Sequence, residues 1–279
     1  MTISPIQSAR SRRSASGGRM TAAQRVLSVL EAFDTEHLVL TLSEISRRAG
    51  LSLSTAHRLV GELREWGALE RSAEGRYAIG MRVLELGGLE PQGLRLREVA
   101  HPYLGDLQTA VNANVHLAVR NGHDTVYVES LCARGGAAVL TRLGGRWPLH
   151  ATGTGQVLLA FAPPAFQEEV LASPLRRFTR KTVTDPVELR HVLAGVRQTG
   201  VAIADESITA DAFAVAVPIR GPRDRVIAAL GVTVHHEQAE INAALPALMG
   251  TARAISRACG APGAQGAAVS SSANHATAV

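Results

Sequence analysis

Residues 41–60, which read TLSEISRRAGLSLSTAHRLV, decide the fold of the N-terminal part of the chain. Thr41 and Glu44 have the spacing of a capping box, in which each side chain satisfies a free backbone amide at a helix start. Gly50 supplies the left-handed residue that ends such a helix, and Ser52 or Ser54 can cap another helix directly after it. The stretch predicts two helices joined by a short turn. Their expected buried faces are Leu42, Ile45 and Ala49, and Ala56, Leu59, Val60 and Leu63.

The segments on either side complete a small domain. Thr21 and Gln24 form another capping box. The apolar residues that follow have the spacing of one helix face, and they are Val26, Leu27, Leu30 and Phe33. Downstream, the helix ends at Trp66-Gly67, and residues 69–71 and 77–79 flank a turn at 72–75. Three helices followed by a hairpin predict a winged helix-turn-helix domain over residues 21–80.

This organisation indicates double-stranded DNA as a partner. The turn would direct the N-terminal polar face of the later helix into a major groove. Hydroxyl and guanidinium groups there can bind base edges or phosphates. The alternative is a three-helix packing unit with solvated charges. The expected DNA contacts are Arg47, Arg48, Ser52, Ser54, Thr55, His57, Arg58, Arg71 and Arg76.

Composition limits the class of protein. The 279 residues predict about two domains, and a hydrophobic fraction of 46% argues against a disordered chain. The sequence has neither an apolar run of about 20 residues nor a secretory signal, so we expect a soluble cytoplasmic protein without membrane contact. Its two cysteines, Cys132 and Cys259, are too few for a disulfide framework or a closed zinc site.

Charge agrees with DNA binding without establishing it. The formal net charge is +5, and residues 1–80 hold eleven arginines against eight acidic residues. The single lysine is Lys181. Arginine in place of lysine suits phosphate and guanine recognition, but a GC-rich genome also favours arginine codons.

The rest of the chain predicts a second domain between two tails. Residues 1–20 read as a disordered basic arm, 81–91 as a linker helix and 260–279 as a disordered tail. Residues 92–259 alternate helical and strand patterns, so we expect an α+β domain there. Its expected helices are 94–111, 186–199 and 238–257, and its expected strands are 115–119, 125–128, 137–140, 212–219 and 226–234.

Four segments in this order resemble the IclR family of bacterial transcription regulators. They are LSLSTAHRL at 51–59, RWPLHATG at 146–153, LLAF at 158–161 and TVTD at 182–185. The resemblance covers about residues 21–259. It implies a winged helix that dimerises on operator DNA and a C-terminal effector domain of GAF-like fold. It also implies homodimers that pair into a dimer of dimers, and a small organic effector that changes operator affinity.

The resemblance also implies an effector pocket. Part of it is the loop at 153–155, whose amides could hold a carboxylate, although a Gly-Thr-Gly run alone is also typical of a tight turn. Ala204 and Ala214 stand where the family often has an acidic residue and a cysteine, Asp211 replaces a frequent glycine, and GVT at 231–233 replaces Ser-X-Ser. These departures leave open a more apolar or aromatic ligand, or a pocket that binds nothing. The expected effector-binding residues are Gly153, Thr154, Gly155, Asp205, Ala214, Gly231 and Thr233.

No pattern indicates catalysis, a metal or a cofactor. His235-His236 lacks a third ligand, and neighbouring strand residues point to opposite faces. His116 and His150 have no recognisable nucleophile beside them. We therefore expect no enzyme activity, but a ligand-responsive repressor of a metabolic operon. The alternatives are a constitutive DNA-binding regulator with a degenerate pocket and a small-molecule enzyme with a winged-helix interaction module.

Overall fold

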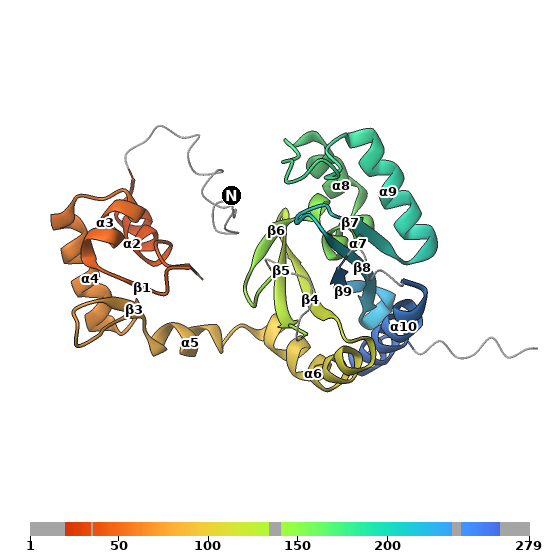
Figure 1. Ribbon diagram of the computed structural model, residues 1–279, viewed down its shortest axis with the longest axis horizontal. Helices are drawn as coiled ribbons and strands as arrows, with labels where there is room; N and C mark the ends of the chain where they lie inside the picture. Colours follow the sequence, from red (N-terminus) through yellow and green to blue (C-terminus); the bar gives the residue numbers. More distant parts are fainter. Residues whose placement is uncertain (1–19, 35, 134–140, 236–240, 263–279) are drawn as a thin grey trace, which may run out of the picture.

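The computed structural model describes residues 20–34, 36–133, 141–235 and 241–262. A small N-terminal domain is joined through helix α5 (Met81–Gly87) to a larger C-terminal domain (Figure 1). The strand expected at 137–140 lies outside the described residues, as do nearly all of the arm expected at 1–20 and most of the tail expected at 260–279.

The N-terminal domain has the three predicted helices and the hairpin in the predicted order, with one additional strand. The elements are α2 (Ala22–Leu30), β1 (Val39–Leu40), α3 (Leu42–Ala49), α4 (Leu53–Trp66), β2 (Leu69–Arg71) and β3 (Tyr77–Ile79). Both capping boxes form, Ser52 caps α4, and Gly50 ends α3 with a φ of 68°. The winged helix-turn-helix prediction is confirmed. The sequence did not reveal β1, which adds to the hairpin to give a three-stranded sheet in the order β1-β3-β2.

The buried face of α2 differs from the prediction. Leu27 is 47% exposed, whereas Val29 is fully buried in the core of the domain. Phe33 is buried as expected but lies beyond the last residue of the helix, Leu30. The helix ends one turn earlier than the apolar spacing suggested. Val26 and Leu30 pack against this core as expected, so Leu27 is the one error in the predicted face.

The C-terminal domain is an antiparallel sheet covered on both faces, which confirms the α+β class. Its strands have the order β6-β5-β4-β9-β8-β7. Helices α6 and α10 pack on one face, and α7, α8 and α9 lie on the other (Figure 1). The strands are β4 (Asn114–Asn121), β5 (Asp124–Leu131), β6 (Arg146–Pro148), β7 (Ala202–Asp205), β8 (Ala212–Arg220) and β9 (Val226–His235). The helices are α6 (Pro91–Val111), α7 (Gly153–Ala160), α8 (Pro164–Ala172), α9 (Pro186–Thr199) and α10 (Ile241–Ala258).

Burial on both faces explains the composition of the central strands. β8 reads AFAVAVPIR and β9 reads VIAALGVTVH, with few polar residues on either side of the strand. Leu104, Leu248 and Ile255 fill one layer, and Leu159, Leu189 and Leu193 fill the other. The small residues of these strands let the helices approach the sheet closely.

Residues 153–155 are not the loop expected from the sequence. They form the first turn of α7, in which all eight residues are buried. Thr152 caps this helix by accepting a hydrogen bond from the Gly155 amide. A Cβ atom on Gly155 would lie only 2.4 Å from the Leu149 carbonyl oxygen. Glycine is therefore required at this position by close packing, and not by the backbone geometry of a turn.

Candidate DNA-binding surface and ligand pocket

The N-terminal half of α4 presents a polar surface. Ser52 donates a hydrogen bond from its hydroxyl to the Thr55 hydroxyl at 2.9 Å, which orders the start of the helix. Ser54, His57 and Arg58 are exposed, whereas Ala56 and Leu59 on the opposite face are buried. Arg58 forms an ion pair with Glu62 one turn later. The expected residues of α4 thus share one accessible face.

The arginines around α4 have different environments. Arg47 is exposed at the end of α3. Arg48 instead turns into the domain, where its guanidinium donates to the Ala32 carbonyl at 2.6 Å and to the Asp34 carboxylate at 2.5 Å. These bonds join α3 to the segment after α2, so the guanidinium of Arg48 is engaged inside the domain.

Two further arginines lie on the wing. Arg71 stacks over the Tyr77 ring at 5.6 Å, and an Arg76 nitrogen lies 3.9 Å from a carboxylate oxygen of Glu44 at the start of α3. Both side chains are exposed. The hairpin therefore presents two guanidinium groups while Arg76 also connects the wing to α3.

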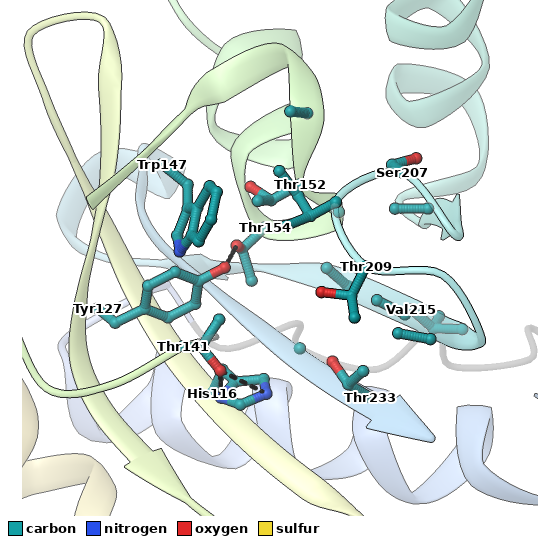
Figure 2. A pocket seen from close by; sticks show the side chains of 18 residues that line it. His116, Tyr127, Thr141, Trp147, Thr152, Thr154, Ser207, Thr209, Val215 and Thr233 are labelled. Atoms are coloured by element: carbon teal, nitrogen blue, oxygen red, sulfur yellow. Dashed lines mark hydrogen bonds between the residues drawn. The ribbon is translucent and has the colours of Figure 1, made fainter. Parts of the chain in front are cut away.

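The C-terminal domain contains a pocket between the sheet and the N-terminal end of α7 (Figure 2). The space measures about 550 Å³, including its opening to solvent. Its lining comes from all six strands of the sheet, the start of α7, the segments just before and after β6, and the β7–β8 loop. The lining residues are His116, Tyr127, Thr141, Trp147, Ala151, Thr152, Gly153, Thr154, Ala204, Ser207, Ile208, Thr209, Ala212, Ala214, Val215, Ala216, Gly231 and Thr233.

The structure gathers five of the seven expected effector residues at this pocket: Gly153, Thr154, Ala214, Gly231 and Thr233. Gly155 does not line the pocket, because it faces the Leu149 carbonyl and the Thr152 hydroxyl behind the first turn of α7. Asp205 does not line it either, and its carboxylate lies 2.9 Å from the Lys181 ammonium. Neither residue is therefore placed to contact a ligand in the pocket.

Several lining residues were missed from the sequence. They are His116, Tyr127, Thr141, Trp147, Thr152, Ser207 and Thr209. His116 and Tyr127 face each other edge to face with ring centroids 5.6 Å apart. They lie on neighbouring strands within patterns that resemble those of ordinary core strands, so the sequence carried no signal for their shared position.

The lining is rich in hydroxyl groups and has no formal charge at neutral pH. Among its residues, all of which are described, there is no Asp, Glu, Lys or Arg. Burial lowers the pKa of His116 to about 4, so its imidazole is neutral at pH 7. Burial also raises the pKa of Tyr127, which keeps the phenol protonated. Polarity in the pocket therefore comes from hydrogen-bonding groups rather than from ions.

Two hydrogen-bonded clusters lie at different places in the pocket. The Tyr127 hydroxyl is 3.2 Å from the Thr154 hydroxyl at the start of α7. His116 lies on β4, with its Nδ1 3.1 Å from the Ser130 hydroxyl and 3.2 Å from the Thr141 hydroxyl. Figure 2 shows Tyr127 above His116 and Thr141, on the same side of the cavity. A ligand with polar groups at both ends can therefore meet both clusters.

The β7–β8 loop forms another wall and is fixed from outside. Thr182 donates its hydroxyl to the Ser207 carbonyl at 2.6 Å, and Thr179 donates to the Glu206 carbonyl at the same distance. Lys181 forms ion pairs with Asp205 and Glu206 at 2.9 and 3.0 Å. These bonds hold the start of the loop from outside the pocket, and Thr182 at the start of the TVTD segment supplies the one to Ser207.

Because His116 is buried, the stability of the C-terminal domain should depend on pH. Its pKa falls from about 6.5 in the unfolded chain to about 4 in the folded one, so the unfolded state binds more protons between these values. Stability should therefore fall by about 3 kcal/mol as the pH drops from 6.5 to 4, and change little above 6.5. Urea unfolding at pH 5, 6 and 7.5 measures this slope.

The His116→Gln variant identifies the source of that slope. It removes the buried imidazole but keeps a side chain that can bond to Ser130 and Thr141. Burial also lowers the pKa of His150, which contributes with the same sign and remains in the variant. The variant should show a shallower dependence, whereas an unchanged slope would exclude His116 as the main titrating group.

Two other expectations concern features outside the pocket. Within the described residues, no group of three or more His, Cys, Asp or Glu side chains could hold a metal ion. His235 bonds to the Asp211 carboxylate at 3.2 Å, and its neighbour His236 is outside the described ranges. In those ranges, every helix is too short or too polar to cross a membrane.

Comparison with known families gives two matches that cover both domains. Residues 22–73 match the IclR helix-turn-helix domain, and residues 91–258 match the C-terminal domain of the bacterial transcriptional regulator IclR. The two matched segments agree with the domain division seen in the structure, and the second alone covers more than half of the chain.

The alignments with individual relatives cover most of the chain. The chain is 31% identical over 246 residues to the HTH-type transcriptional regulator XynR of Escherichia coli, covering 86% of this chain and 98% of that protein. It is 32% identical over 228 residues to the glycerol operon regulatory protein of Streptomyces coelicolor, covering 80% and 89% of the two chains.

Solved structures agree with these relatives. A crystal structure of an IclR homologue from Microbacterium hydrocarbonoxydans, complexed with 4-hydroxybenzoate, is 38% identical with a TM-score of 0.79, and the match covers 86% of this chain and 99% of that one. The relatives named here are regulators rather than enzymes. With its DNA-binding helix-turn-helix domain and its matched C-terminal domain, the chain belongs to the IclR family of bacterial transcriptional regulators.

Proposed function

We propose that the chain is a ligand-responsive repressor of a metabolic operon. In this proposal the winged helix binds operator DNA, and a small organic effector in the C-terminal pocket changes its operator affinity. The observation that carries the proposal is the uncharged, hydroxyl-lined pocket in the domain that α5 joins to the winged helix. The Microbacterium relative that was crystallised with 4-hydroxybenzoate and the relative named transcriptional repressor IclR support it.

The accessible face of α4 is our candidate for base readout. The proposed contacts are Arg47, Ser52, Ser54, Thr55, His57 and Arg58, with Arg71 and Arg76 contacting the backbone from the wing. Arg48 is left out because its guanidinium bonds to Ala32 and Asp34 inside the domain. Since the operator lies on the bacterial chromosome, the proposed place of action is the cytoplasm.

Exposed apolar side chains on and beside α5 support a homodimer. Met81, Leu84 and Leu89 are 61%, 68% and 75% exposed. Apolar groups gathered on one short segment indicate a protein interaction site. A homodimer through this segment, and a dimer of dimers beyond it, would give paired winged helices for an operator with two half-sites.

The proposed coupling is a shift between conformational populations. Operators require their half-sites at about one helical turn or a multiple of it, so a small change in the placement of paired winged helices weakens binding. A coupling free energy of about 1–3 kcal/mol would change operator affinity about 5- to 150-fold. α5 is the connection through which the pocket can act.

A constitutive regulator with a degenerate pocket is the second candidate. Ala204 and Ala214, in place of polar side chains, are the observation that favours it. The two candidates differ in whether any small molecule stabilises the protein, because only a bound ligand raises the free energy of unfolding.

Thermal unfolding with 4-hydroxybenzoate as the first probe tests the proposal, followed by other small aromatic and aliphatic acids. A ligand at a hundred-fold excess over its Kd should add about 2.7 kcal/mol of stability. For a domain of this size the Tm should rise by about 5–10 °C. If no compound in such a panel raises the Tm, the constitutive alternative replaces the proposal.

Ala214→Leu, which adds three carbon atoms to the pocket wall, should abolish the Tm rise. The matched control is Ile203→Leu on the neighbouring strand, where the side chain is 51% exposed and lies outside the pocket. This control should respond to the ligand as the unchanged chain does. An equal Tm rise in Ala214→Leu would place the ligand elsewhere.

A further inference from the structure

The indole nitrogen of Trp147 is buried and lacks a hydrogen-bond acceptor among the described residues. Trp147 lies on β6 and is only 2% exposed. Among the residues that line the pocket, all of which the structure describes, the indole nitrogen is the one buried side-chain nitrogen or oxygen atom without a hydrogen-bond partner. Buried polar groups in native proteins are nearly always paired, so this N–H requires an explanation.

The indole nitrogen and the hydroxyl groups near it can each donate a hydrogen bond. The nitrogen is on the edge of the indole ring that faces the hydroxyl groups of Tyr127 and Thr154 (Figure 2). Those hydroxyls lie 3.2 Å apart, the Thr152 hydroxyl also interacts with Tyr127, and each hydroxyl can donate as well as accept a hydrogen bond. An indole N–H can only donate. This corner of the pocket is therefore complementary to an oxygen atom that accepts several hydrogen bonds.

The start of α7 adds to the same corner. The amides of Gly153 and Thr154 belong to the first turn, whose N–H groups have no acceptor within the helix. Both residues line the pocket. The positive end of the helix dipole favours an anion there. A carboxylate suits this corner better than a neutral carbonyl, because it offers two acceptor oxygens and a negative charge.

The rest of the cavity fits a flat ring. His116, Tyr127 and Trp147 provide three ring systems on one side, as Figure 2 shows. The other walls include small residues: Gly153, Ala204, Ala214, Ala216 and Gly231. A planar ligand can stack between these sides. The His116–Thr141 cluster offers hydrogen bonds to a substituent at the far end of such a ring.

We propose that Trp147 determines effector specificity by donating its indole N–H to the carboxylate of a small aromatic acid. This inference rests on the proposed effector pocket and adds the class of ligand and the residue that selects it. The chain should therefore distinguish an aromatic acid from the same ring without its carboxylate, and Trp147 should be responsible for much of that difference.

Trp147→Phe in the full-length chain tests the proposal, with 4-hydroxybenzoate and phenol as the two probes. Phenylalanine keeps an aromatic ring against Phe178, whose centroid lies 5.5 Å from that of Trp147, but it has no N–H. Isothermal titration calorimetry should show about a ten-fold loss of 4-hydroxybenzoate affinity, equivalent to about 1.4 kcal/mol, and little change for phenol. Circular dichroism and the Tm without ligand check that the variant folds.

Trp66→Phe is the matched control, because it makes the same substitution at a tryptophan of α4 that is 49% exposed and far from the pocket residues in sequence. It should bind both probes as the unchanged chain does. An equal loss for acid and phenol in Trp147→Phe would show a packing role and overturn the inference. Unchanged acid affinity would overturn it as well.

The failure of this inference can be told apart from failure of the proposed function. If the chain binds neither aromatic acid nor phenol, but another class of metabolite raises its Tm and changes its DNA affinity, the inference fails and the proposed function stands. If no metabolite has either effect, the proposed function fails with it.

Discussion

Gly155→Ala is expected to destabilise the C-terminal domain by about 3 kcal/mol, near the upper end of the usual effect of overpacking a core. The added Cβ would lie 2.4 Å from the Leu149 carbonyl oxygen, 2.6 Å from the Thr125 hydroxyl and 2.7 Å from the Thr152 hydroxyl. One of these contacts is with backbone, so the first turn of α7 must move. The Tm should fall by about 6–12 °C.

This change should also reduce ligand binding, because α7 brings Gly153 and Thr154 to the pocket. Movement of its first turn would displace the Thr152 cap, which accepts the Gly155 amide at 3.0 Å. Thermal unfolding with and without 4-hydroxybenzoate measures both effects. A variant that melts with the unchanged chain would contradict the tight packing described here.

Gly195→Ala provides the matched control with the opposite sign. Gly195 is within α9, and a Cβ atom there would meet no atom within 4 Å. Alanine in an open helix position stabilises by about 0.5–1 kcal/mol relative to glycine. The same substitution should therefore raise the Tm at one glycine and lower it at the other, according to the space around each.

Thr55→Ala and Arg58→Ala are each expected to weaken operator binding by about 1–3 kcal/mol, or about 5- to 150-fold. Both residues lie in the N-terminal half of α4, where Arg58 is exposed opposite the buried residues and Thr55 is half-buried beside it. The fold should survive, because the Arg58–Glu62 ion pair is exposed and such pairs contribute little stability. Fluorescence anisotropy with the DNA flanking the chain's own gene measures the loss.

Arg64→Ala is the control for this pair. Arg64 is exposed in the last turn of the same helix, and its position is rotated away from Arg58 around the helix axis. Removing its charge should weaken binding to operator and random DNA to the same small extent. Operator affinity that stays unchanged in both Thr55→Ala and Arg58→Ala would show that another surface reads the operator.

The N-terminal fold could be predicted because its signals are local. Capping residues, a left-handed glycine and short apolar spacings act within a few residues of one another, and Thr41, Gly50 and Ser52 all have their predicted roles. The error at Leu27 arose where the local signal was weakest, since the apolar residues of α2 fit more than one helix face. Packing against α3 and α4 determines that Val29, and not Leu27, is buried.

The C-terminal sheet was predictable in class but not in detail. Asn121-Gly122 marked the β4–β5 hairpin, whereas β6 and β7 are short edge strands with little pattern of their own. α7 was missed because its glycines and threonines resemble a turn. Its helical state depends on burial among the sheet, Leu149 and Thr152, which are tertiary contacts that spacing does not reveal.

Identifying the residues of the pocket required both the family resemblance and the structure. The resemblance led to Gly153, Thr154, Ala214, Gly231 and Thr233, all of which line the cavity. Asp205 was expected in the pocket because of its polar side chain. That side chain, at the end of a strand, instead points outward and pairs with Lys181. Trp147 was quoted only as part of a motif, and its buried N–H became visible only when its neighbours were known.

Operator binding with and without an effector shows whether the pocket and the winged helix are coupled. The DNA flanking the chain's own gene would be titrated by anisotropy against excess random-sequence competitor at fixed, roughly physiological salt, because non-specific binding depends strongly on salt. The titration would then be repeated with a compound that raises the Tm. We predict binding that survives the competitor and changes about 5- to 150-fold with the compound. A compound that binds tightly in the pocket and leaves operator affinity unchanged would contradict the coupling between the two domains.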